Sequence, residues 1–172
     1  MASAWHILLS LMWVFIVTFV VFPGAFFDSH FNFMDNSSNE FTWYSLSIIL
    51  TFNVMDTVGR KLGGLVKVPT PIVHALSLAR SLFIVTTILI ALSDKDEDKT
   101  IENDGLKIAN MVLFAVTNGF TSTLCAIKAP EYVDDDQKEQ VGIFVGLFIA
   151  LGIVIGSLIA VPVGNVLPVN WS

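Results

Sequence analysis

Five long apolar stretches dominate this chain, and their length limits what it can fold into. Each is close to the roughly 20 residues that an α-helix needs to cross the hydrocarbon core of a bilayer. Backbone polar groups inside a bilayer must bond internally, which favours helices. The sequence therefore predicts an all-α, multi-pass membrane protein with one membrane domain over residues 1–172. Its predicted spans lie at about 4–22, 43–65, 72–92, 108–127 and 141–161.

Composition and charge agree with a membrane protein. Hydrophobic residues make up 54% of the chain and charged residues 14%, against about 25% charged in soluble domains. The net charge of -6 comes from acidic residues in the connecting segments, so the chain lacks the basic face that nucleic-acid binding requires. The single cysteine, Cys125, rules out an internal disulfide and any cysteine-based zinc site.

Motifs of catalysis and of metal or cofactor binding are not found in the sequence. It holds neither a glycine-rich phosphate loop nor a nucleophile motif. The acidic segment 93–107 carries Asp94, Asp96 and Asp98 at the spacing of a calcium loop, but Lys99 stands where that loop needs glycine. We therefore predict no enzyme activity, no metal site and no cofactor.

Charged residues inside two predicted spans are the strongest functional signal. Asp56 and Arg60 are four positions apart, so they share one helix face and can pair. An ionised group at mid-membrane costs about 2.5 to 3.5 kcal/mol, so such groups usually face a polar cavity or the bundle interior. Alternatively, Arg60 and Lys61 extend to the headgroups from the end of their span. Arg80 lies too deep for that, and we expect a polar centre shared by the second and third spans.

Small and amide residues in the last two spans suggest helix contacts. Gly142 with Gly146, and Gly152 with Gly156, form two small-xxx-small pairs that allow helices to approach closely in lipid. Asn118 in the fourth span either offers its amide to a ligand or bonds to a neighbouring helix.

Loop lysines and a glycosylation sequon predict the topology. With the N-terminus inside, cytoplasmic loops hold four lysines and outer loops hold three. The sequon at Asn36 then lies outside. Both signals favour N-in, C-out, and an organellar inner membrane or the plasma membrane would suit these features equally.

A motif in the second span resembles a known transporter family. Phe52-Asn53-Val54-Met55-Asp56-Thr57-Val58-Gly59-Arg60 resembles the F-N-x-x-D-x-x-G-R signature in the eighth helix of equilibrative nucleoside transporters. Ala79-Arg80, Thr117-Asn118-Gly119-Phe120, and Glu139 with the glycine-rich last span follow in the order of the family's ninth to eleventh helices. Phe22-Pro23-Gly24 resembles the close of the seventh. The resemblance covers nearly the whole chain.

This resemblance implies both a fold and a site. The fold would be a five-helix half-bundle, the C-terminal half of an eleven-helix, major-facilitator-like transporter. Asp56 and Arg60 would line its central cavity and contact the nucleoside ribose, with Arg80 and Asn118 as further substrate-binding candidates.

Two functional hypotheses follow, because the chain starts at its own Met1 and holds no counterpart of the family's first six helices. In the first, which we place ahead because packing demands less of a sequence, it is an accessory structural subunit of a larger membrane complex, for example a mitochondrial energy-transducing complex. In the second, it pairs with a separate N-terminal half for facilitative nucleoside transport. The expected partners are the lipid bilayer, other membrane subunits or that other half, and nucleosides; none is a nucleic acid.

Overall fold

The computed structural model describes residues 4–22, 38–93 and 104–166, and these residues form helices joined by short turns. This part of the chain contains no β-strand, which confirms the all-α prediction. The main helices are α1 (Trp5–Val21), α3 (Ser38–Leu65), α4 (Thr70–Ala79), α5 (Leu82–Ser93), α6 (Asp104–Lys128) and α7 (Lys138–Val166). Two 3₁₀ turns, Ala129–Tyr132 and Asp135–Gln137, connect α6 to α7.

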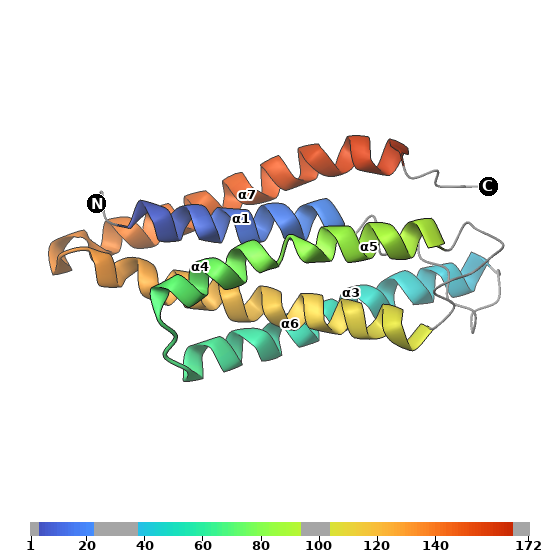
Figure 1. Ribbon diagram of the computed structural model, residues 1–172, viewed down its shortest axis with the longest axis horizontal. Helices are drawn as coiled ribbons and strands as arrows, with labels where there is room; N and C mark the ends of the chain where they lie inside the picture. The colour runs from blue at the N-terminus through green and yellow to red at the C-terminus, as the bar shows by residue number, and fades with distance from the viewer. Residues whose placement is uncertain (1–3, 23–37, 94–103, 167–172) are drawn as a thin grey trace.

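The helices lie roughly parallel to one long axis and alternate in direction along it (Figure 1). α1 and α6 are central: α1 packs against α7, α4, α5 and α6, and α6 also packs against α3. α1 begins and α7 ends at opposite ends of the bundle. This arrangement is the predicted membrane half-bundle.

Several helices have the length and composition of membrane spans. By these criteria the segments Thr70–Ile90, Gly105–Tyr132 and Asp135–Pro162 can each cross a bilayer, and α1 is equally apolar but shorter, at 17 residues. α3 is long, at 28 residues, but carries Asp56 and Arg60 within its length.

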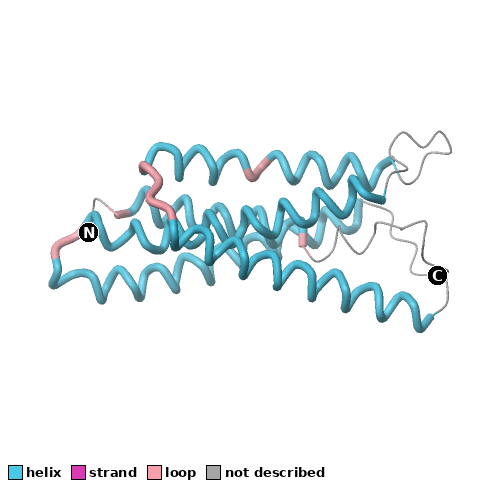
Figure 2. The backbone as a smooth tube through the Cα atoms, turned by 90° about the horizontal axis from the view of Figure 1, so that it is seen from below, coloured by secondary structure: helices cyan, strands magenta, loops and turns pink. Residues whose placement is uncertain are grey.

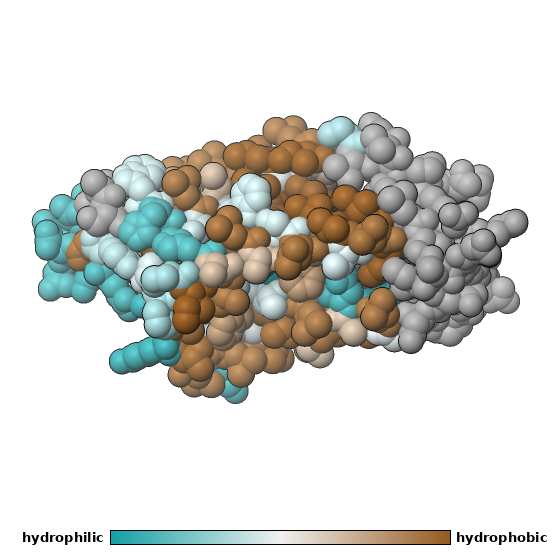
Figure 3. All heavy atoms as spheres, in the orientation of Figure 1, coloured by the Kyte–Doolittle hydropathy of each residue, from teal (hydrophilic) through white to brown (hydrophobic). Residues whose placement is uncertain are grey.

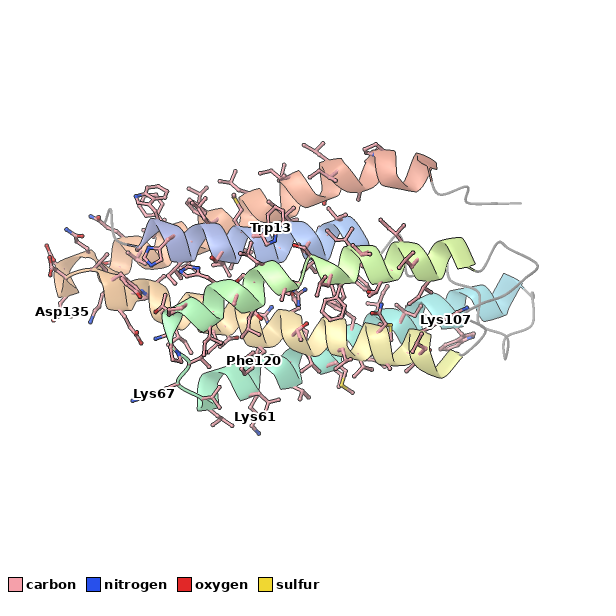
Figure 4. The ribbon with its side chains drawn as sticks, viewed as in Figure 1. Trp13, Lys61, Lys67, Lys107, Phe120 and Asp135 are labelled. Carbon is pink, nitrogen blue, oxygen red and sulfur yellow. The ribbon has the colours of Figure 1, made fainter. Side chains whose placement is uncertain are left out.

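Apolar side chains cover the middle of the visible face, and hydrophilic residues gather at one end (Figure 3). Lys67 and Asp135 lie toward that end, and Lys107 lies toward the other (Figure 4). An apolar middle of this kind suits a surface that faces a bilayer. The sequon at Asn36 and most of the acidic segment, residues 94–103, lie outside the described residues.

The third predicted span, 72–92, is interrupted. α4 ends before Arg80 and α5 begins after Ser81, a break visible as a short loop segment in Figure 2. Around it the Ser81 N–H bonds to the Leu78 carbonyl at 3.0 Å and the Phe83 N–H to the Arg80 carbonyl at 3.0 Å. These bonds reach three residues back, as in the tighter 3₁₀ helix, which often marks a functional or strained point in a helix.

Glycines let α3 and α6 touch through their backbones. A Cβ on Gly59 would overlap the Val116 carbonyl oxygen, and one on Gly119 would overlap the Asp56 carbonyl oxygen. One helical turn further along α3, a Cβ on Gly63 would lie 2.7 Å from the carbonyl oxygen of Phe120. The two helices therefore cross without side chains between them at this point.

The two glycine pairs of α7 differ in whether they contact another helix. A Cβ on Gly152 would lie 2.7 Å from the Met12 carbonyl oxygen of α1, and Gly156 would come equally close, 2.7 Å, to the carbonyl oxygen of Ile16. Added Cβ atoms on Gly142 and Gly146 would meet no atom of the described chain within 4 Å. Only the second pair thus makes a close helix contact in the described structure.

Candidate functional site

Asp56 and Arg60 form an ion pair on α3. The Arg60 Nε donates to Asp56 Oδ2 at 2.7 Å, as their spacing of four residues predicts. The Asp56 side chain is only 13% exposed, whereas that of Arg60 is 47% exposed. The carboxylate therefore belongs to the bundle interior, and the guanidinium reaches the surface of the described structure.

Asn118 of α6 holds the other carboxylate oxygen. Its Nδ2 donates to Asp56 Oδ1 at 2.7 Å, and the residue is 2% exposed. Because an ionised carboxylate can only accept hydrogen bonds, this contact fixes which way the amide points. The amide oxygen then faces Thr18 of α1, whose hydroxyl donates to it at 2.7 Å.

Arg80, at the junction of α4 and α5, is buried at 2% exposure. Its Nη1 donates to the Phe114 carbonyl at 3.1 Å and to the Thr117 hydroxyl at 2.8 Å, and its Nη2 donates to the Thr18 hydroxyl at 3.0 Å. The guanidinium carbon also lies 4.9 Å from the Phe114 ring centroid, a cation–π contact. Its Nε has no hydrogen-bond partner among the described residues.

Sequence reasoning missed Thr18. Its hydroxyl lies 2.7 Å from the Val14 carbonyl one turn back, the local contact that threonines in membrane helices commonly make. The same oxygen accepts from Arg80 and faces Asn118. The only signal in the sequence was a hydroxyl deep in an otherwise apolar span. That signal is weak, because a threonine hydroxyl can donate its hydrogen bond to a backbone carbonyl of its own helix.

These contacts form one hydrogen-bonded chain, in the order Arg80, Thr18, Asn118, Asp56 and Arg60. It joins α1, α3, α6 and the junction of α4 and α5. Of the four predicted site residues, Asp56 touches Arg60 and Asn118 directly. Hydrogen bonds connect Arg80 to them through Thr18. Bonds of this kind strengthen one another in a low dielectric environment.

The exposed end of the chain lies beside further polar groups on α3. Asn53 and Thr57 are exposed, and their spacing to Arg60 places them along the same side of the helix. Both also bond to backbone carbonyls of α3: Asn53 to Ile49 at 2.7 Å, and Thr57 to Asn53 at 2.8 Å. This polar strip offers donors from a guanidinium and acceptors from a carboxylate within one turn, a combination suited to neighbouring hydroxyl groups.

Comparison with known proteins agrees with the resemblance found in the motifs. The family model described as "Nucleoside transporter" matches residues 1–163. The chain is similar to human equilibrative nucleoside transporter 1, at 27% identity over 137 residues. That alignment covers 77% of this chain and 30% of the human protein, so the chain corresponds to about a third of its relative's length. With the family model matched over nearly its whole length, this integral membrane protein belongs to the nucleoside transporter family.

Proposed function

We propose that this chain forms one wall of a nucleoside-binding cavity and takes part in facilitative nucleoside transport, together with membrane helices from outside these 172 residues. Transporters of this kind bind substrate between two helical units that rock about a central site. The human relative is, by its name, an equilibrative nucleoside transporter, and the aligned part of it is 30% of its length. The other wall would come from the partner helices.

The observation that carries this proposal is the half-exposed guanidinium of Arg60. Its Nε is held by the buried Asp56, and the side chain remains 47% exposed. An arginine fixed at one nitrogen can direct its remaining donors outward in a defined geometry. Ribose hydroxyls would accept from Arg60 and donate to Asp56, whose two oxygens have lone pairs beyond those used by Arg60 and Asn118.

This proposal reverses the order of the two hypotheses raised from the sequence. An accessory subunit would need the polar side of α3 only as a packing surface, and such a surface does not require an oriented carboxylate. Here Asp56 is oriented by donors on both oxygens, from α3 and from α6. Orientation of this kind supports ligand recognition more than packing.

Uptake of radiolabelled uridine tests the proposal, using cells deficient in nucleoside uptake that express the full chain with its membrane partners. We expect saturable uptake that Arg60→Ala abolishes while the protein still reaches the membrane. Lys61→Ala is the matched control, because it removes an exposed positive charge one residue further along the same helix. That variant should retain most of the uptake.

Two results would count against this proposal, the first against the role of Arg60 and the second against transport itself. Uptake indifferent to Arg60→Ala would remove this residue from the route. A complex that assembles stably, never supports uptake and is unaffected by Arg60→Ala would favour the accessory-subunit hypothesis.

A further inference from the structure

We propose that Thr18 and Arg80 are positioning residues, which hold Asp56 in place from behind and leave substrate contact to Asp56 and Arg60. The inference rests on the proposed function. It also changes the expectation for Arg80, which the family resemblance suggested as a substrate-binding residue.

Burial separates Arg80 from any substrate on the α3 side. The residue is 2% exposed, and its terminal nitrogens bond to α6 and α1. A nucleoside at Arg60 would meet Asp56 first and Asn118 behind it. Arg80 would then influence the substrate only through the groups between them.

Hydrogen donation along the chain runs in one direction, from Arg80 to Asp56. A guanidinium only donates, so the Thr18 oxygen must accept from Arg80. The carboxylate only accepts, so the Asn118 amide nitrogen must face Asp56 and its oxygen must face Thr18. The Thr18 hydroxyl has one proton and two acceptors at 2.7 Å, the Val14 carbonyl and Asn118 Oδ1, and the sequence is complete when that proton points at Asn118. Each end of the chain therefore fixes the orientation of the groups in the middle.

The Thr18 hydroxyl is the link on which this arrangement depends. Without it, Arg80 Nη2 and Asn118 Oδ1 both lose a partner in a buried site, where unsatisfied polar groups are costly. The Asn118 amide would then be held from one side only, by Asp56, and the donor that it gives to Asp56 Oδ1 would be positioned less tightly. Asp56 would keep its bonds to Arg60 and Asn118, but its carboxylate would be held less rigidly toward a ribose hydroxyl.

The test compares Thr18→Val with Thr18→Ser in uptake of uridine and of 2′,3′-dideoxyuridine. Valine keeps the shape of threonine and removes the hydroxyl, whereas serine keeps the hydroxyl. We expect Thr18→Val to raise the KM for uridine about tenfold, the effect of losing one hydrogen bond to a charged group. It should leave the KM for the dideoxynucleoside nearly unchanged. Thr18→Ser should keep the uridine KM close to that of the unmodified protein.

Thr117→Val is the control that separates the positioning of Asp56 through Thr18 from the loss of any single hydrogen bond to Arg80. It removes a 2.8 Å bond to the same guanidinium, while Nη1 keeps the Phe114 carbonyl and the chain to Asp56 stays intact. We expect this variant to keep the selectivity of the unmodified protein. Should Thr18→Val fail to reach the membrane, Asn118→Ala breaks the chain one link nearer the carboxylate and should show the same selective loss.

Equal losses for both substrates, or equal effects of Thr18→Val and Thr117→Val, would overturn the positioning role while leaving transport intact. Failure of the proposed function looks different, since the unmodified protein would then show no saturable uptake of uridine.

Discussion

Arg60 and Arg80 lie at opposite ends of one hydrogen-bonded chain, yet only Arg60 reaches the surface of the described bundle. Its side chain is 47% exposed, and Arg80 as a residue is 2% exposed. Two residues of the same type are therefore expected to respond differently to substitution.

Arg80→Ala should destabilise the protein more than Arg60→Ala. Arg80 bonds to α1 and α6 from the junction of α4 and α5, and its loss leaves a cavity and unpaired acceptors. We expect a loss of at least about 2 kcal/mol in unfolding free energy for Arg80→Ala. Arg60→Ala should cost less, because the half-exposed Arg60 side chain leaves no cavity in the core and the buried Asp56 keeps its bond to Asn118. Thermal unfolding in mild detergent measures both, and the reverse order would contradict the burial described here.

Gly119→Ala should loosen the contact between α3 and α6. Its new methyl group would overlap the Asp56 carbonyl, and overpacking of this kind costs about 1 to 3 kcal/mol. Gly64→Ala on α3 is the control, because a Cβ there meets no atom within 4 Å of the described chain. The control should be neutral or stabilising by up to about 1 kcal/mol, since alanine favours helix. Equal midpoints for the two variants would show that the backbones do not touch at Gly119.

The two glycine pairs of α7 should also differ. Gly152→Val places a branched side chain against α1 and should lower the unfolding temperature. Gly146→Val enters open space and should leave that temperature unchanged in the purified chain. A larger fall in unfolding temperature for Gly146→Val than for Gly152→Val would mean that α7 makes its close helix contact through the Gly142 and Gly146 pair.

Cysteine labelling should place residues 67 and 135 on the same side of the membrane. Lys67 lies in the connection between α3 and α4, and Asp135 in the connection between α6 and α7, at the same end of the bundle (Figure 4). Cys125 is fully buried at 0% exposure, so an impermeant maleimide should react with Lys67→Cys or Asp135→Cys with little background.

The N-in topology predicts that both cysteines are cytoplasmic. Tags at the two termini should be accessible from opposite sides. Labelling of the two cysteines from opposite sides would refute this arrangement of the loops.

The sequence was sufficient for the membrane class, the family and the pairing of Asp56 with Arg60. Apolar length and a spacing of four are local properties that a helix converts directly into geometry. The contact between Asn118 and Asp56 was harder to foresee, since it depends on how α3 and α6 cross. The family motifs named both residues without saying that they touch.

Other features could not be predicted from the sequence. The segment around Arg80 contains neither glycine nor proline, so nothing local predicted the break between α4 and α5. The two glycine pairs of α7 share one pattern, and only the placement of α1 decides which of them is used. Thr18 resembles any threonine in a membrane helix until Arg80 and Asn118 are placed beside it.

The glycine contacts define two closely packed helix pairs within the bundle. α3 and α6 touch through their backbones at Gly59 and Gly119, and α1 and α7 do so at Gly152 and Gly156. Helices in such contact have no side chains between them to repack, so we expect each pair to move as a unit. Thr18 lies on the seam between the two pairs and bridges it with a single hydroxyl. If the bundle shears during a transport cycle, this is the plane along which it should slip, and the Thr18 bridge would have to break and re-form at each passage.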